Sequence, residues 1–428
     1  MRESQKRLSN AFFALISLPA TAMGLALSIQ ISALSWLLST RYQLDIHEIG
    51  IVWAAGPLAG IFGQVIIGVI SDKAWFWGGR RRPFILIGGA TAALMLFLLP
   101  RLGEVNAALG IGNILVTAVI VALTLDLSIN ISFNPTRSII ADVTPEGAAR
   151  TKGYTWMQTV SGFWGVMSYV IGATLGNDFL INGGMLLVFV FSVLPILFVQ
   201  EPRTLHRPDV PTDAPATQSD WPQLWRIYFA HGFSWIGVQT MFVYIIAFIQ
   251  QHLIPAGAAA AEASAQAGTM IGISFAIMST VGFLLPALVL EPLAKRIGRV
   301  HTQAACIAIM ALGYFLIAFA ASSALMLYAM MAIVGIGWAA VVSLPFAIMT
   351  EKVDRARTGF FMGIFNLSVV LPQLFVSLVL GSVIQQAQDK NIIFLICGES
   401  LAMSAVLWTL VRESKGAATA DSPRGGAH

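Results

Sequence analysis

The sequence predicts an all-α membrane protein with twelve transmembrane helices, from its composition, its long uncharged runs and the positions of its basic residues. Of its 428 residues, 57% are hydrophobic and 11% are charged, whereas soluble domains carry about 25% charged residues. The charged residues form short islands between long apolar runs. This pattern excludes a soluble globular protein and predicts segments that lie in a lipid bilayer.

Twelve apolar runs approach or exceed the about 20 residues that a membrane span needs. Backbone groups in hydrocarbon must be satisfied within their own segment, so we expect helices rather than strands. The first run lacks a small-residue cleavage site, so we expect a retained span and not a signal peptide. The expected spans are 10–39, 48–70, 84–100, 110–141, 153–175, 184–200, 224–250, 268–290, 301–320, 324–349, 359–385 and 391–411.

Basic residues gather in the loops on one side of this topology. The loops on the side opposite the amino terminus contain only Arg41, Arg101 and Lys390. The positive-inside rule therefore predicts that both termini lie in the cytoplasm, below an inner or plasma membrane. Because topology explains the isoelectric point of about 9.2, we expect no nucleic-acid partner.

A polar connection with five prolines, residues 201–223, separates two sets of six spans. We expect residues 1–200 to form an amino-terminal six-helix half and residues 224–411 to form a carboxy-terminal half. Residues 201–223 would be a cytoplasmic linker, and residues 412–428 a flexible cytoplasmic tail.

The loops after the second and eighth spans repeat one arrangement, in which six residues separate an acidic residue from Gly-Arg. Equivalent signals in equivalent loops indicate an internal duplication. We expect these loops to be gating latches that join neighbouring helix ends through charge-assisted hydrogen bonds. Ordinary positive-inside residues would explain the arginines but not the spacing. The residues concerned are Asp72, Gly79, Arg80 and Arg81 in the first loop, and Glu291, Gly298 and Arg299 in the second.

Asp126 lies near the middle of the fourth span, where an ionisable side chain is costly and is usually functional. Asn130, Asn134 and Arg137 follow it within about 80° on one helical face. Asp126 is therefore a candidate proton carrier, with a structural carboxylate as the alternative. Arg137 lies roughly 16 Å further along the helix, so it is either a cavity residue or an interfacial arginine.

Two other ionisable residues lie within spans. We interpret Glu399 as a residue of helix packing or of an oligomer contact, and His231 as a histidine hydrogen bonded between helices. Cys306 and Cys397 both lie inside spans, so a stabilising disulfide is not expected.

Several motifs together resemble the sucrose transporter family, within the glycoside–pentoside–hexuronide:cation symporter group of the major facilitators. The match in the second and third spans includes Trp53, Gly56-Pro57, Gly60, Gln64, Gly68, Ser71-Asp72 and the run Gly79-Arg80-Arg81-Arg82-Pro83-Phe84-Ile85. The fourth span matches at Asp126, Pro135, Arg137 and Asp142. The tenth and eleventh spans match at Ser343, Pro345, Ala347, Gly363, Asn366-Leu367, Val370 and Pro372-Gln373.

This resemblance implies the major facilitator fold and a proton-coupled importer of sucrose, maltose or a related glucoside. It also implies a central cavity lined by the fourth span. We expect the protein to be a monomer. Side-chain amides and aromatic rings bind sugars by hydrogen bonding and stacking, although polar residues also join membrane helices. The candidate sugar-binding residues are Asp126, Asn130, Arg137, Gln158, Asn366, Gln373, Gln30, Trp53, Gln64, Trp235 and Gln239.

The coupling ion follows from the second span, which has no acidic residue between Glu48 and Asp72 at its ends. The melibiose branch of the same group uses paired carboxylates there for sodium, so we expect protons here. No phosphate loop, paired metal-ligand histidines or nucleophile elbow is present. We therefore expect neither an enzyme nor a cofactor nor a metal site.

Two other functions are compatible with the fold. An exporter of hydrophobic compounds would favour an apolar cavity, whereas the fourth span carries a polar stripe. A sugar sensor without transport activity would favour a long signalling tail, whereas the expected tail, residues 412–428, is short.

Overall fold

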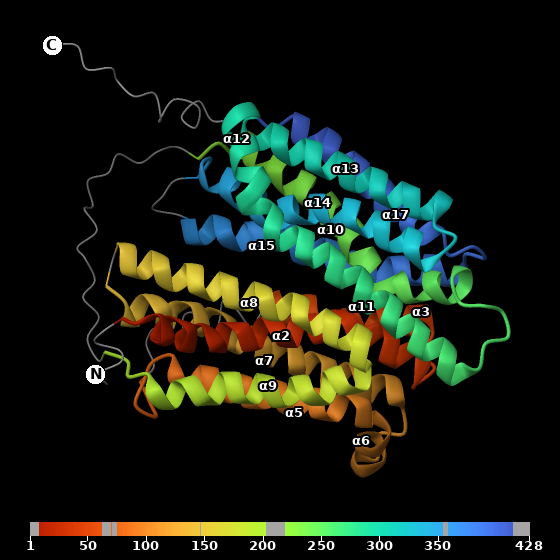
Figure 1. Ribbon diagram of the computed structural model, residues 1–428, viewed down its shortest axis with the longest axis horizontal. Coiled ribbons are helices and arrows are strands. Elements are labelled where there is room, and N and C mark those ends of the chain that lie inside the picture. The colour runs from red at the N-terminus through yellow and green to blue at the C-terminus, as the bar shows by residue number, and fades with distance from the viewer. Residues whose placement is uncertain are drawn as a thin grey trace. The chain divides into compact units, whose positions relative to one another are not determined.

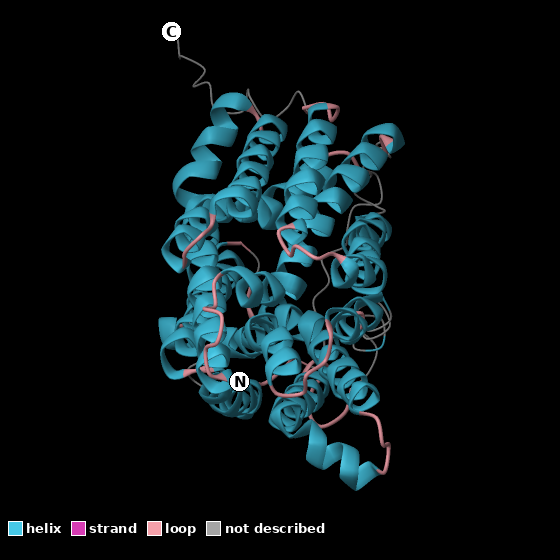
Figure 2. Ribbon diagram, turned by 90° about the vertical axis from the view of Figure 1, so that its right-hand side faces the viewer, coloured by secondary structure: helices cyan, strands magenta, loops and turns pink. Residues whose placement is uncertain are grey.

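The structure, a computed structural model, describes residues 8–61, 70, 75–145, 147–202, 219–353 and 358–413. These residues form helices and connecting loops, and no strand is assigned among them (Figure 2). In this part of the chain, 10 helical stretches are long and apolar enough to cross a membrane. The predicted all-helical membrane class is confirmed.

Two of the twelve expected spans are not among these ten. The expected span 153–175 is a helix, α8 (Ala148–Leu175), with polar residues along its length. The expected span 48–70 begins in the apolar helix Ile46–Ile61 and continues into residues 62–69, outside the described residues. Gln64 and Asp72 also lie outside the described residues.

The chain divides into two compact units. Unit 1 comprises Met1–Thr212, Phe242–Ala276 and Gln373–Lys390, and unit 2 comprises Asp213–Met241, Ile277–Pro372 and Asn391–His428. The division passes through three helices: α10 (Trp221–His252), α11 (Ala260–Leu285) and α15 (Thr358–Phe375).

Unit 1 is built on two long helices, α2 (Asn10–Thr40) and α7 (Ile114–Val143), which pack against each other (Figure 1). Helix α2 also packs on α8 and on α9 (Asn177–Phe198), and α5 (Arg82–Leu98) packs on both α7 and α9. An apolar cluster joins three of these helices: α2 contributes Phe12, Phe13 and Ile16, α7 contributes Ile140, and α9 contributes Ile196. The remaining helices of this stretch are α3 (Ile46–Trp53), η1 (Leu99–Arg101) and α6 (Leu102–Leu109).

Helix α3 packs on a π-helical stretch, η4 (Val376–Leu380), and on α16 (Gly381–Gln386), all within unit 1. A π-helix does not form the regular i to i−4 hydrogen bonds, and the Tyr244 hydroxyl donates to the Val376 carbonyl at 3.1 Å. Gly50 and Gly381 leave room for this tyrosine, because an added Cβ would lie 2.5 Å and 2.7 Å from its hydroxyl oxygen.

In unit 2, α13 (Arg299–Ala320) packs on α14 (Ala324–Thr350) and α17 (Ile392–Thr409). Gly337 of α14 lies against α13 so closely that an added Cβ would be 2.8 Å from the Cys306 carbonyl oxygen. Two shorter elements, the π-helix η2 (Pro286–Leu290) and α12 (Glu291–Ile297), lead into α13.

Gly88 allows α5 to approach α7, and we predict that Gly88→Ala destabilises the protein. The added Cβ would lie 2.6 Å from the Ser128 carbonyl oxygen, and overpacking of this kind costs about 1–3 kcal/mol. Thermal unfolding of the purified protein in detergent would measure the loss. Gly24→Ala in α2 is the control, because nothing lies within 4 Å of its added Cβ. Equal unfolding temperatures for the two variants would contradict the prediction.

Candidate functional site

Asp126 lies in the middle of α7, a 30-residue helix that begins after Asn113, whose side chain accepts from the Leu115 amide. The Asp126 side chain is only 4% exposed, and so is that of Gln30 on α2. The Gln30 Nε2 donates to Asp126 Oδ2 at 3.0 Å. The structure therefore brings together two of the candidate residues that the sequence analysis placed in different spans.

The backbone next to Asp126 completes this environment. Asn130 Nδ2 donates to the Asp126 backbone carbonyl at 2.8 Å, one helical turn away. Gly56 faces the carboxyl group, and an added Cβ there would lie 3.4 Å from Oδ2 and 3.6 Å from Cγ. The carboxyl group is thus enclosed by an uncharged amide and by the backbone of a glycine. Such a site can hold the group in the absence of a cationic partner.

Trp53, Gln158, Gln373 and Arg137 are the other candidates among the described residues of unit 1. Trp53 Nε1 donates to Ser35 Oγ at 2.8 Å, and Gln158 is exposed on α8, while Gln373 is partly buried. Arg137 is also exposed, and its guanidinium lies 4.1 Å from the centroid of the Phe133 ring.

Three candidates, Trp235, Gln239 and Asn366, belong to unit 2. His231 in the same unit is 2% exposed, accepts from Trp235 Nε1 at 3.0 Å and stacks on Phe365 at 4.8 Å. Its hydrogen bond is thus made to the next turn of its own helix. Glu399 is exposed on α17.

The first predicted latch loop is held by Glu201, which sequence reasoning missed. Its carboxylate accepts from the backbone amides of Arg80, Arg81 and Arg82 at 2.7–3.1 Å, where α5 begins. Gly79 leaves space for it, since an added Cβ would lie 2.5 Å from Glu201 Oε1. A carboxylate is favourable at a helix amino terminus because the free amides there carry partial positive charge.

The second latch loop repeats this arrangement in unit 2. Glu413 accepts from the backbone amides of Arg299 and Val300 at 3.0 and 2.9 Å, where α13 begins. Gly298 has a φ of +90°, and an added Cβ would lie 2.7 Å from Glu413 Oε2. Glu201 lies three residues after the end of α9, and Glu413 lies four residues after the end of α17. An acidic residue just after the sixth and twelfth spans was the sequence signal.

Ion pairs support both loops. Arg81 pairs with Asp142 near the end of α7 at 3.2 Å, with both side chains nearly buried, and Arg299 pairs with Glu351 just after α14. The expected acidic partner Glu291 instead pairs with Lys295 of its own helix at 3.0 Å.

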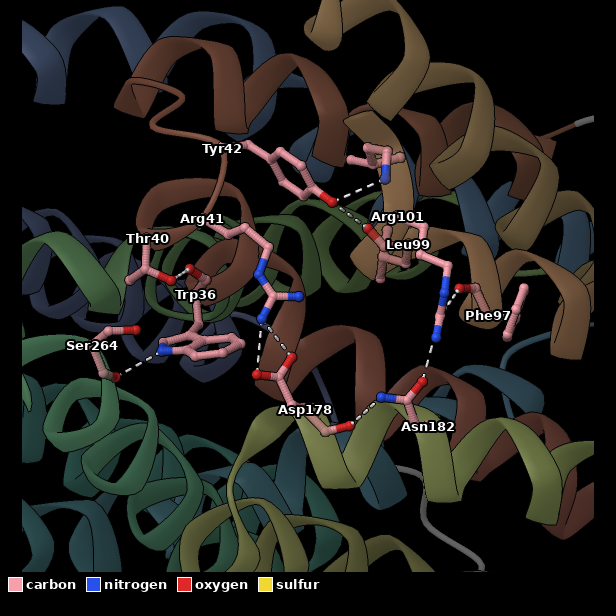
Figure 3. Close-up of polar contacts among 11 residues, drawn as sticks. Trp36, Thr40, Arg41, Tyr42, Phe97, Leu99, Arg101, Asp178, Asn182 and Ser264 are labelled. Carbon is pink, nitrogen blue, oxygen red and sulfur yellow. Dashed lines mark hydrogen bonds and ion pairs between the residues drawn. The ribbon is translucent and has the colours of Figure 1, made fainter. Parts of the chain in front are cut away.

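A polar cluster marks the opposite end of unit 1 (Figure 3). Arg41 Nη2 lies 2.8 Å from both carboxylate oxygens of Asp178, which joins α2 to α9. Trp36 Nε1 donates to the Ser264 carbonyl of α11 at 2.8 Å. We name this group, with Tyr42 and Arg101, the Arg41 cluster.

Tyr42 connects the Arg41 cluster to η1 and α6. Burial raises the pKa of Tyr42, so its hydroxyl stays protonated at neutral pH. It donates to the Leu99 carbonyl at 3.3 Å and accepts from the Leu102 amide at 2.9 Å. The cluster therefore fixes the ends of helices from several parts of unit 1.

Comparisons with known proteins agree with this architecture. The sequence profile of the Major Facilitator Superfamily matches residues 16–377 and 240–427. The sucrose transport protein SUC4 of Arabidopsis thaliana is 24% identical over 416 residues, covering 81% of this chain and 79% of that protein. The general alpha-glucoside permease of Schizosaccharomyces pombe is 30% identical over 128 residues, covering 28% of this chain and 23% of the permease.

Solved structures share the fold. The nucleoside transporter NupG superposes with a TM-score of 0.70 at 15% identity, covering 94% of this chain and 99% of that chain. The inward-open xylose transporter XylE from E. coli gives a TM-score of 0.68 at 14% identity, covering 95% of this chain and 97% of that chain.

Loss of either capping glutamate should destabilise the protein. Glu201→Ala or Glu413→Ala leaves backbone amides at the start of α5 or α13 without their acceptor, at a cost of about 1–2 kcal/mol. Thermal unfolding in detergent would measure each variant. The control is Glu291→Ala, because an exposed ion pair such as Glu291–Lys295 contributes at most about 1 kcal/mol. A larger loss for Glu291→Ala than for the capping variants would refute the assignment.

Proposed function

The chain belongs to the Major Facilitator Superfamily, and from this premise we propose that it imports a disaccharide or glucoside, of the sucrose or maltose type, together with protons. It is a multi-pass membrane transporter and not an enzyme. Import by alternating access, in which the site opens to one side of the membrane at a time, is the mechanism we propose.

The buried Asp126 carboxyl group carries this proposal. An ionisable group in the middle of a span is costly unless it has a function, and its hydrogen-bond partner is the uncharged Gln30 amide. An ionised carboxylate only accepts hydrogen bonds, whereas a protonated one also donates. A sugar hydroxyl that binds Asp126 can distinguish these two states, and in this way sugar occupancy is linked to protonation.

The choice of sugar rests on relatives of the chain. SUC4, a sucrose transport protein, aligns with 81% of it, and a general alpha-glucoside permease aligns with 28%. We propose Asn130, Gln158, Asn366 and Gln373 as further sugar-binding residues. Arg137, Trp53, Gln64, Trp235 and Gln239 complete the proposed set.

The choice of protons rests on the second span. It has no acidic residue between Glu48 and Asp72 at its ends, and sodium prefers several oxygen ligands. A single midplane carboxyl group suits one proton better than a sodium ion.

We further propose twelve spans in an inner or plasma membrane, with both termini in the cytoplasm and a monomeric protein. The halves would be residues 1–200 and 224–411, joined by the linker 201–223. In this topology the capped loops at Arg80 and Arg299 face the cytoplasm and control the conformational switch. The Arg41 cluster then faces the outside, where its contacts close the external side of unit 1.

Sugar uptake should depend on a proton gradient and not on sodium. We expect vesicles containing the purified protein to accumulate radiolabelled sucrose or maltose when the sugar side is acidic. A protonophore should abolish accumulation, whereas replacement of sodium by potassium should not change it. Sodium-dependent uptake that persists with the protonophore would overturn the choice of ion.

Asp126→Asn should abolish accumulation against a gradient while still permitting exchange of sugar across the membrane. The amide keeps the size and hydrogen-bonding capacity of the side chain but cannot bind and release the coupled proton. Sugar affinity measured against pH should also become flat in this variant. Glu399→Gln, the same change at an exposed carboxyl group of α17, is the matched control and should retain accumulation. Proton-driven accumulation by Asp126→Asn would place the proton carrier elsewhere.

A further inference from the structure

Gln30 is the side chain through which α2 contacts the carboxyl group of α7. Its amide nitrogen lies 3.0 Å from Asp126 Oδ2, and both side chains are 4% exposed. The two residues are 96 positions apart in sequence, so the hydrogen bond depends on the packing of α2 against α7. A side chain committed to this contact is poorly placed to bind a sugar as its main role.

A glutamine amide suits a carboxyl group that changes its charge. The amide has an NH₂ donor and a carbonyl acceptor on the same carbon. The donor satisfies the ionised carboxylate, and rotation of the amide by about 180° offers the carbonyl to a protonated carboxyl group. Arginine or lysine would satisfy only the ionised form, and an apolar residue would satisfy neither.

Charged neighbours do not take over this role. Helix α2 has no charged residue between Asn10 and Thr40, and among the described residues no charged side chain forms a recorded pair with Asp126. The charged and titratable residues on α7 and on the elements packed against it are Arg137, Asp142, His47, Glu48, Arg82, Arg101, Glu104, Arg150, Lys152, Tyr154 and Tyr169. Among the described residues, the Gln30 amide is therefore the side-chain group that hydrogen bonds to the Asp126 carboxyl group and favours its ionised form.

We infer that Gln30 is the positioning residue of Asp126: it holds the carboxyl group in both charge states and sets the pH at which that group takes up a proton. The inference rests on the proposed function, because it assigns Gln30 a task within the same site. Gln30 is thereby removed from the candidate sugar-binding residues, because its amide contacts Asp126 and not the sugar. Gly56 defines the other side of the carboxyl group, so the side chain is held between two elements.

Gln30→Leu tests the inference, since leucine fills a similar volume without donating a hydrogen bond. The infrared carbonyl band of the protonated carboxyl group reports Asp126 directly, once it is assigned by its loss in Asp126→Asn. In membranes without sugar, we expect the titration midpoint of this band to move to higher pH in Gln30→Leu. The hydrogen bond to the ionised carboxylate is stronger than the one that the amide makes to the protonated group, so loss of both should shift the midpoint by about one pH unit.

The matched control is Gln303→Leu, the same substitution at a fully buried position of α13 in unit 2. Both polar side-chain atoms of Gln303 are buried and have no hydrogen-bond partner among the residues that the structure describes. This variant should leave the Asp126 midpoint unchanged. If Gln30→Leu fails to fold, Gln30→Met, which keeps an unbranched side chain, replaces it.

A sugar-binding measurement separates this inference from the proposed function. At a pH low enough to protonate Asp126 in both proteins, Gln30→Leu should bind sucrose or maltose within about threefold of wild type. An unmoved midpoint, or no Asp126-dependent band at any pH, would overturn the inference. Weaker sugar binding at every pH with an unmoved midpoint would show that Gln30 contacts the sugar. A moved midpoint in a protein that binds neither sugar would support the inference and refute the proposed substrate.

Discussion

The absence of water in hydrocarbon governs the structure, because a polar group within the bilayer costs free energy unless it finds a partner inside the protein. Hydroxyl groups in the spans satisfy this constraint locally: Thr124 and Ser128 each donate to the carbonyl four residues before them. Asp126 has no such local solution for its carboxylate, and a side chain from another helix supplies the donor. The register between α2 and α7 is thereby tied to the chemistry of one carboxyl group.

A second need for partners arises at the ends of the helices, where the first amides and the last carbonyls have no partner within the helix. The starts of α5 and α13 are capped by glutamates from distant positions, with separations of 121 and 114 residues to Arg80 and Arg299. The two capped loops carry a glycine at the same place, Gly79 before α5 and Gly298 before α13, so the same local arrangement occurs once in each unit. At the start of each helix, one carboxylate accepts hydrogen bonds from more than one backbone amide.

The sequence was sufficient to predict the all-helical membrane class and to single out Asp126 as a candidate, but not to predict which side chains surround it. Long apolar runs have no other stable form in lipid, and a lone acidic residue in such a run stands out against its neighbours. Gln30 was recognised only as one polar residue among many, because its partner depends on how α2 and α7 meet. Glu201 and Glu413 were read as ordinary linker and tail residues, since their partners are backbone amides that carry no signature in the sequence. Glu291 fitted the repeated spacing, yet its carboxylate reaches Lys295, one turn away, more easily than a neighbouring helix.

The capping of α5 by Glu201 has a consequence for biosynthesis. A ribosome delivers the chain from the amino terminus, so α5 enters the membrane well before residue 201 has been made. Until then the amides of Arg80, Arg81 and Arg82 have only water or lipid headgroups as partners. The Arg81–Asp142 ion pair can form first, and the amides at the start of α5 gain their acceptor only when the chain has been synthesised past Glu201. The cap of α5 thus forms only after α9 has been made, and the Glu413 contact repeats this order for α13 and α17.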